Sequence, residues 1–432
     1  MTETCWRLRG RMESRREVVQ ELLPERILLV DAAGRQPLPC QALHGLSRRC
    51  WKSGHYDNES GTAEGILCLF LEAKFFFAPS KPFAYLYLSG LILERMCVTM
   101  MDFIGKLSGF VGKNLTYIVF LVVIWAYFMP NAFLWAVPHT VLLLGVIMFG
   151  MGMTLHARDF KLIVQRPKEV LIGCTAHYTI MPLLAYALVL AFEMPPEIAV
   201  GMILLGSCPS GTASNVMGFL AKADVPLSVS ITTCSTLLAP IMMPFIVWGL
   251  AGQWVEVSFM AMAMTVMKVI LVPLILGLLT HRLMGEKHIA SLSKVLVLVS
   301  AFGVLVIVGG VIAINGAKIL DMGIFIILMV LLHNLGGFLI GYFVTGKLGL
   351  GKKQQHSVTL EVGMQNDALA ISLVSVFFAP AVAIPAAVGA AIHQVTGSIL
   401  AGIFARHMDA HETKEKAKAQ AETLMEAVPG SH

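Results

Sequence analysis

Long apolar segments recur at short intervals between residues 114 and 405, and each has about the length of a membrane-spanning helix. A helix needs ~20 mostly apolar residues to cross the hydrocarbon core of a bilayer. The pattern therefore predicts an all-α membrane protein with ten transmembrane helices. The predicted helices are 114–135, 138–155, 168–192, 197–221, 225–250, 258–283, 291–314, 319–345, 355–378 and 383–405.

Composition supports a lipid environment for these helices. Of the 432 residues, 56% are hydrophobic and 14% are charged, and the mean hydropathy is +0.75. Soluble domains carry roughly 25% charged residues. A soluble fold of this size could not cover so much apolar surface, so the lipid bilayer is an expected partner. The net charge of +5 is small, and we expect no nucleic-acid partner.

Residues 1–99 differ from the rest of the chain. They begin with a stretch rich in Arg, Glu and Ser, 1–64, that has no sustained helical or alternating pattern. The two apolar runs that follow, 65–77 and 82–93, are shorter than a spanning helix. We expect a poorly ordered extension, or sequence upstream of the true start of the protein. A regulatory domain is the alternative.

Basic residues are concentrated in every second connecting loop. The loops after even-numbered helices contain ten of them, whereas the loops after odd-numbered helices contain only Lys318. The ten are Arg158, Lys161, Arg166, Lys168, Lys222, Arg282, Lys287, Lys347, Lys352 and Lys353. Because Lys and Arg favour the cytoplasmic side, we expect both termini in the cytoplasm, and residues 407–432 to form a charged cytoplasmic tail.

This orientation makes the two halves of the domain inverted repeats. Five predicted helices fall within 114–250 and five within 258–405, and the two sets cross the membrane in opposite directions. Secondary transporters are commonly built in this way and alternate access around a central site. Residues 100–406 are thus predicted to form one ten-helix domain.

Polar residues interrupt the fourth and ninth predicted helices. The fourth contains Ser-Cys-Pro-Ser-Gly-Thr-Ala-Ser-Asn at 207–215, in which Pro209 removes a backbone donor and Gly211 lowers the cost of unwinding. The ninth contains Glu-Val-Gly-Met-Gln-Asn-Asp at 361–367, and a charge at mid-membrane costs about 2.5–3.5 kcal/mol. Breaks at matching positions in two halves point to a binding site. A pair of structural kinks is the alternative.

The chemistry of these breaks favours a hard cation. Carboxylate, amide, hydroxyl and carbonyl oxygens are hard ligands, and one Glu with neutral oxygens suits a monovalent ion. Freed helix N-termini offer positive dipole ends to an anionic substrate. The residues thus indicate a cation-coupled carrier for an organic anion, with no cofactor beyond the coupling ion. An intramembrane enzyme or a channel that uses Glu361 is the alternative.

Other motifs do not change this interpretation. The eight cysteines form no C-x-x-C or Cys/His cluster with metal-ligand spacing, which favours small buried residues. The G-x-x-x-x-G-K sequence at 346–352 lacks the following Ser or Thr of a P-loop and lies in a basic loop. Lys268 is either a counter-charge for Glu361 or substrate, or a snorkelling side chain. His333 and Asn334 are expected to make interhelical hydrogen bonds.

Three segments carry a family resemblance that covers residues 114–406. They are Gly-Thr-Ala-Ser-Asn-Val at 211–216, Leu-Ser-Val-Ser-Ile-Thr-Thr at 227–233 and Glu-Val-Gly-Met-Gln-Asn at 361–366. Together they resemble the bile acid:sodium symporter family, which includes bacterial carriers for pantoate-like and keto acids. The resemblance implies panel and core domains, and fourth and ninth helices that cross at their breaks. It also implies sodium symport of a small organic anion, such as pantoate, a keto acid or a bile-acid-like compound, across the cell (inner) membrane.

The resemblance also implies two sodium sites and a substrate site. The first sodium site would comprise Ser214, Asn215, Ser228, Thr232 and Glu361. The second would comprise Glu361, Gln365, the backbone carbonyls of Val362 and Met364, and His177 from the third helix. Thr212, Asn366, Asp367 and His393 lie at or beside positions near the substrate. Spacing supports the first set independently, because Ser228 and Thr232 are four residues apart on one helix face.

Three residues depart from the family pattern. His177 stands where Gln is usual, Asp367 where Ser and Gly are common, and Gln394 where Asn is common. Asp367 is interpreted as an acidic cap of the second half-helix. The alternative hypothesis is that His177 and Asp367 add a titratable element whose protonation competes with the second sodium. We therefore expect the second sodium site and the substrate pocket to differ from those of a standard bile-acid carrier.

Overall fold

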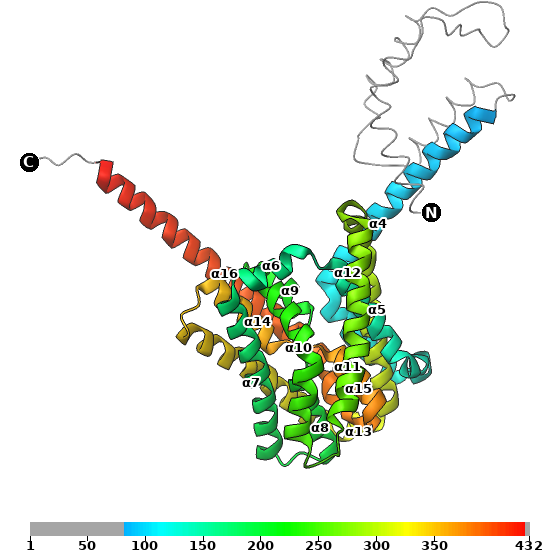
Figure 1. Ribbon diagram of the computed structural model, residues 1–432, viewed down its shortest axis with the longest axis vertical. Coiled ribbons are helices and arrows are strands. Elements are labelled where there is room, and N and C mark those ends of the chain that lie inside the picture. The colour runs from blue at the N-terminus through cyan, green and yellow to red at the C-terminus, as the bar shows by residue number, and fades with distance from the viewer. Residues whose placement is uncertain (1–81, 428–432) are drawn as a thin grey trace, which may run out of the picture. The chain divides into compact units, whose positions relative to one another are not determined.

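The computed structural model describes residues 82–427, and every regular element in that range is a helix (Figure 1). The elements are α4 (Pro82–Phe128), η1 (Pro130–Ala132), η2 (Leu134–His139), α5 (Thr140–Thr154), α6 (Ala157–Gln165), α7 (Pro167–Ala191), α8 (Pro196–Ser207), α9 (Ala213–Leu220), α10 (Val225–Ala251), α11 (Phe259–Val266), η3 (Met267–Leu271), α12 (Val272–Met284), α13 (Glu286–Lys347), α14 (Lys352–Gly363), α15 (Asp367–Phe377), η4 (Pro380–Ala383) and α16 (Ile384–Ala427). The predicted all-α fold class is confirmed for these residues.

The chain divides into two units, Met1–Lys106 and Leu107–His432. Within the predicted extension, the structure describes the residues from Pro82 onward, which form the first part of α4. The rest of the extension, 1–81, and the last five residues, 428–432, lie outside the described residues. In the predicted tail, α16 continues as a helix beyond residue 406 to Ala427.

Six helical segments among the described residues are long and apolar enough to cross a membrane. They are Pro130–Thr154, Pro167–Ala191, Val225–Ala251, Phe259–Met284, Leu292–Lys347 and Pro380–His411. α8 and α15 are apolar too, but they contain only 12 and 11 residues because each adjoins a break. The protein is therefore a multi-pass membrane protein.

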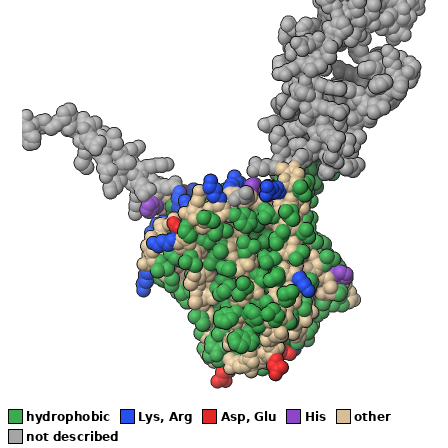
Figure 2. All heavy atoms as spheres, in the orientation of Figure 1, with side chains coloured by type: hydrophobic (Ala, Val, Ile, Leu, Met, Phe, Trp, Pro, Cys, Tyr) green, Lys and Arg blue, Asp and Glu red, His purple; other side chains and the backbone are tan. Residues whose placement is uncertain are grey.

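The surface of the described residues is that of a protein in lipid. Hydrophobic side chains cover the middle of the face in Figure 2. Lys and Arg gather at one end, and acidic side chains without basic neighbours lie at the opposite end. Large apolar side chains are open to the surroundings, including Ile324 at 87% and Leu283 at 86% exposure. Such extensive apolar exposure is unfavourable in water but not in hydrocarbon.

Most predicted helix bounds agree with the structure. Six predicted segments begin and end within three residues of the bounds that the structure gives. They correspond to α5, α7, α8–α9, α10, α11–α12 and α14–α15. The predicted loop at 315–318 is wrong, because α13 stays helical through it. This stretch contains no proline, and Asn315 Nδ2 donates to the carbonyl of Val311 one turn earlier (2.9 Å).

α8 lies at the centre of the packing. Every residue from Ile198 to Ser207 is buried, and α8 contacts α7, α10, α15 and α16. Pro209 follows directly, so the helix ends inside the protein rather than at its surface. The first break is therefore surrounded by protein, which is the condition for irregular backbone at membrane depth.

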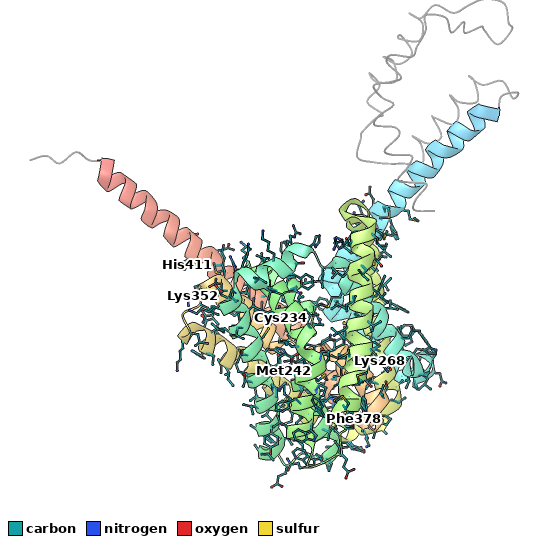
Figure 3. The ribbon with its side chains drawn as sticks, viewed as in Figure 1. Cys234, Met242, Lys268, Lys352, Phe378 and His411 are labelled. Carbon is teal, nitrogen blue, oxygen red and sulfur yellow. The ribbon has the colours of Figure 1, made fainter. Side chains whose placement is uncertain are left out.

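One basic side chain lies within the hydrophobic belt. Lys268 is exposed and lies in η3, a π-helical turn just before Pro273. In Figure 3 its height lies between that of Lys352, near the basic end, and that of Phe378, toward the opposite end. This exposed position agrees with the snorkelling interpretation of Lys268.

Candidate functional site

The two helix breaks meet and pair through their backbones. The N–H of Gly211 donates to the carbonyl of Met364 (3.0 Å), and the N–H of Asn366 donates to the carbonyl of Pro209 (2.9 Å). Ser210 and Gln365 thus form an antiparallel bridge. Gly211 is required here, because a Cβ atom at this position would lie 2.5 Å from the carbonyl oxygen of Gln365. The segments after α8 and after α14 therefore meet and pair through their backbones.

The carboxylate of Glu361 lies at this crossing and is fully buried. It accepts hydrogen bonds from four hydroxyl groups: Ser210 (2.5 Å to Oε2), Ser214 (2.6 Å to Oε1), Thr232 (2.7 Å to Oε2) and Ser228. These hydroxyls come from the first break, α9 and α10, so the carboxylate ties three segments together.

The sequence positions these groups by simple means. Ser228 and Thr232 lie one turn apart on α10, and both reach Glu361. Asp224 caps α10 by accepting a hydrogen bond from the N–H of Leu227 (3.2 Å), which fixes the start of that helix. Thr232 also donates to Asn215 Oδ1 (3.3 Å). The five residues predicted for the first sodium site are therefore brought together.

The electrostatics of this site favour a cation. Each contact that the structure gives to the Glu361 carboxylate is a neutral hydroxyl, and Lys268 does not pair with it. Removing an ion from water costs several kcal/mol, and hydrogen bonds to a charged group return about 1.5–3 kcal/mol each. Because hydroxyl groups can rotate, the same oxygens can turn their lone pairs toward a cation beside the carboxylate.

Ser210 was not predicted as part of the site. It lies in the interrupted segment, but the resemblance assigned no role to it. Its place one residue after Pro209 puts it in the extended backbone that crosses the ninth helix. The only sequence signal for its role is its position, four residues before Ser214, in a hydroxyl-rich break.

The residues predicted for the second sodium site have other partners. Both ring nitrogens of His177 lie against backbone carbonyls: Nδ1 against that of Glu361 (2.9 Å) and Nε2 against that of Cys208 (2.8 Å). The amide of Gln365 donates to the carbonyl of Val362 (3.0 Å), while its Oε1 is buried without a partner. His177 therefore reaches the crossing, but not in the geometry of an ion ligand.

The residues predicted near the substrate lie in or beside the two breaks. Thr212 is exposed at the start of α9, and Asn366 caps α15 by accepting from the N–H of Leu369 (3.2 Å). The cap is therefore Asn366, and the interpretation of Asp367 as the cap is wrong. Asp367 instead pairs with His393 of α16 (3.1 Å). Asp367 Oδ1 and His393 Nε2 are buried without protein partners.

The other polar residues singled out in the sequence have structural partners. His333 contacts the carbonyl of Met181 (2.9 Å), and Asn334 donates to that of Gly363 (2.8 Å) and accepts from Thr396 (2.6 Å). The predicted interhelical bonds are confirmed. Among residues 82–427, no group of three or more His, Cys, Asp and Glu side chains could hold a metal ion.

Comparison with known proteins identifies relatives of the same kind. The profile of the Sodium Bile acid symporter family matches residues 141–322. The chain is 39% identical over 316 residues to the uncharacterized sodium-dependent transporter YocS of Bacillus subtilis (strain 168), a match that covers 73% of this chain and 98% of that protein. It is 36% identical over 279 residues to the probable sodium/metabolite cotransporter BASS1, chloroplastic, of Arabidopsis thaliana, covering 64% and 69% of the two chains. It is 33% identical over 256 residues to the ileal sodium/bile acid cotransporter of Oryctolagus cuniculus, covering 58% and 73%.

Proposed function

The chain belongs to the Sodium Bile acid symporter family, and within that family we propose that it is a symporter which couples sodium entry to uptake of a small organic anion. Its relatives are named as transporters and cotransporters, and the protein is a sodium-coupled transporter rather than an enzyme. Two of these relatives are named as a probable sodium/metabolite cotransporter and a sodium/bile acid cotransporter. Our proposed substrates are pantoate, a keto acid or a bile-acid-like compound.

The observation that carries this proposal is the buried carboxylate at the crossing of the two breaks. We assign the coupling sodium to Glu361 with the oxygens of Ser214, Asn215, Ser228 and Thr232. Ser210 joins this set, because its hydroxyl lies 2.5 Å from the carboxylate. Sodium bound there would neutralise Glu361 and hold the first break, α10 and α14 in one arrangement.

Ten membrane crossings account for the helices of the structure. Five of the six long apolar segments cross once. Leu292–Lys347 has 56 residues, or about 84 Å at 1.5 Å per residue, which is the length of two crossings of a ~30 Å core. We assign it two crossings, with a reversal of direction near Lys318. The end of α4 and the interrupted pairs α8–α9 and α14–α15 supply the other three. We assign the ten crossings to two inverted repeats. We also assign them to a panel domain and a core domain that move against each other.

Charge distribution supports an orientation with both termini in the cytoplasm of a cell, at the inner membrane. Basic side chains gather at one end of the described surface (Figure 2), and Lys and Arg favour the cytoplasmic side. Sodium then enters down its gradient and drives the anion inward. At 100 mV, each net charge moved inward contributes about 2.3 kcal/mol.

We assign the substrate to the side of the crossing formed by Thr212, Asn366, Asp367 and His393. The exposed Thr212 hydroxyl and the positive dipole end of α9 suit a carboxylate. The unpartnered Asp367 Oδ1 and His393 Nε2 suit a substrate that bears a hydroxyl or another polar group beside its carboxylate.

Sodium-dependent uptake tests the proposed function. Proteoliposomes with an inward sodium gradient would be supplied with radiolabelled pantoate, pyruvate or taurocholate. In control proteoliposomes, choline chloride would replace the sodium salt at the same concentration. We expect concentrative, saturable uptake of at least one of these anions in sodium alone. Glu361→Gln keeps the shape of the side chain and removes its charge, so this variant should lose sodium dependence. Full sodium dependence in Glu361→Gln would refute the assignment.

A further inference from the structure

His177 lies at the position that the family resemblance assigns to a second sodium. This imidazole is fully buried in α7. Its Nδ1 lies 2.9 Å from the carbonyl oxygen of Glu361 in the last turn of α14, and its Nε2 lies 2.8 Å from that of Cys208 just beyond α8. One ring thus bridges the ends of both interrupted helices.

These two carbonyls lie at the ends of interrupted helices. Carbonyls in the last turn of a helix lack partners within that helix and carry its negative dipole end. Here each one faces a ring nitrogen of His177. An imidazole ligates a cation through a nitrogen lone pair directed at the ion. A neutral imidazole has one N–H and one lone pair. Because both nitrogens of His177 point at carbonyl oxygens, that lone pair is directed at a carbonyl oxygen and not at a position where an ion could lie.

The other groups of that position are also engaged. The carbonyl of Val362 accepts from the Gln365 amide (3.0 Å), and the carbonyl of Met364 accepts from the N–H of Gly211 (3.0 Å). Both Glu361 carboxylate oxygens accept from the hydroxyls of the first site. One buried oxygen, Gln365 Oε1, remains without a partner. A hard cation needs several converging oxygens. The hydroxyls of the first site can rotate toward an ion, whereas the carbonyls of Val362 and Met364 are backbone groups held by their hydrogen bonds. The residues present therefore do not fit a second sodium.

We propose that this transporter binds a single sodium ion, at Glu361, and that His177 takes the place of a second sodium as a fixed bridge between the two breaks. The inference rests on the proposed function, because it takes sodium binding at Glu361 as given. One consequence concerns charge. Transport of a monovalent anion with one sodium moves no net charge, so a membrane potential would not drive it.

Counting bound sodium tests the inference without a substrate. The purified full-length protein in lipid nanodiscs would be titrated with ²²Na⁺ at constant ionic strength in choline chloride, and bound sodium would be counted per chain. We expect saturation at one sodium per chain. His177→Gln replaces the bridging ring with an amide, the side chain usual at this family position, and should raise the count to two.

A matched variant controls for loss of a buried histidine. His333 is also fully buried and also contacts one backbone carbonyl, that of Met181 (2.9 Å). His333→Gln should therefore keep the count at one. Size-exclusion chromatography establishes that each variant is folded. If a variant is unstable, the number of sodium ions bound per unmodified chain still decides the stoichiometry.

Each outcome has a distinct meaning. Two sodium ions per unmodified chain would overturn the inference and leave the proposed function intact. A count that stays at one in folded His177→Gln would overturn the role of His177. No saturable sodium binding to the unmodified protein would overturn the proposed function itself.

Discussion

Four hydroxyl groups converge on one buried carboxylate, and most of this arrangement could be predicted from single residues. A mid-membrane Glu361 and two hydroxyls one turn apart, Ser228 and Thr232, are visible in the sequence. Ser210 could not be predicted, because its hydroxyl reaches Glu361 only through the pairing of the two breaks (2.5 Å). The contacts of His177 were also unpredictable, since they depend on where α7 lies beside both breaks.

Removal of the Ser210 hydroxyl should weaken sodium binding. A hydrogen bond to a charged group contributes about 1.5–3 kcal/mol, and 1.4 kcal/mol corresponds to a factor of about ten. We expect Ser210→Ala to raise the sodium concentration for half-maximal binding at least tenfold in a ²²Na⁺ titration. Ser230→Ala is the control, because Ser230 is buried on the same helix as Thr232 but bonds to the carbonyl of Pro226 (2.8 Å). Equal affinities in the two variants would exclude Ser210 from the site.

At the scale of elements, the two breaks have different causes. Pro209 ends α8 because it has no backbone N–H and its ring clashes with the preceding turn. The second break, after α14, contains no proline, and there the carbonyl of Met364 accepts from the N–H of Gly211 in place of a helical hydrogen bond. Composition predicts both interruptions. It does not predict the continuity of α13 through 315–318, because a short polar stretch without proline is compatible with either a loop or a helix.

A single methyl group at Gly211 should separate the two breaks. The added Cβ atom would lie 2.5 Å from the Gln365 carbonyl oxygen, which is backbone and cannot rotate away. We expect Gly211→Ala to reduce sodium-dependent uptake at least tenfold in proteoliposomes, while the protein still inserts. Gly249→Ala in α10 is the control, since a Cβ atom there meets nothing within 4 Å. Unchanged uptake in Gly211→Ala would show that close approach of the breaks is not needed.

For the whole molecule, the hydrophobic belt and its charged ends follow from composition and loop charge. Lys318 is the single basic residue of the odd-numbered loops, and it pairs with Glu197 at the start of α8 (2.5 Å). The ends of the protein are thus distinguished by charge, as the positive-inside rule requires.

Reporter fusions test the orientation. In a bacterial host, alkaline phosphatase is active only outside the cytoplasm. We expect a fusion after His432 to be inactive and a fusion that truncates the chain after Asp321, just beyond Lys318, to be active. Green fluorescent protein at the same points should give the opposite pattern. A phosphatase-active fusion at His432 would reverse the proposed orientation.

Sodium-dependent thermal stabilisation tests the central assignment most directly, because it needs no substrate and depends on one side chain. A ligand present at 100 times its Kd stabilises the folded state by about 2.7 kcal/mol. We therefore expect the Tm of the purified protein to rise saturably with NaCl and not with equal concentrations of choline chloride. In Glu361→Gln, the Tm should not depend on sodium. A Tm of Glu361→Gln that rises with sodium as it does in the unmodified protein would contradict the assignment of sodium to Glu361.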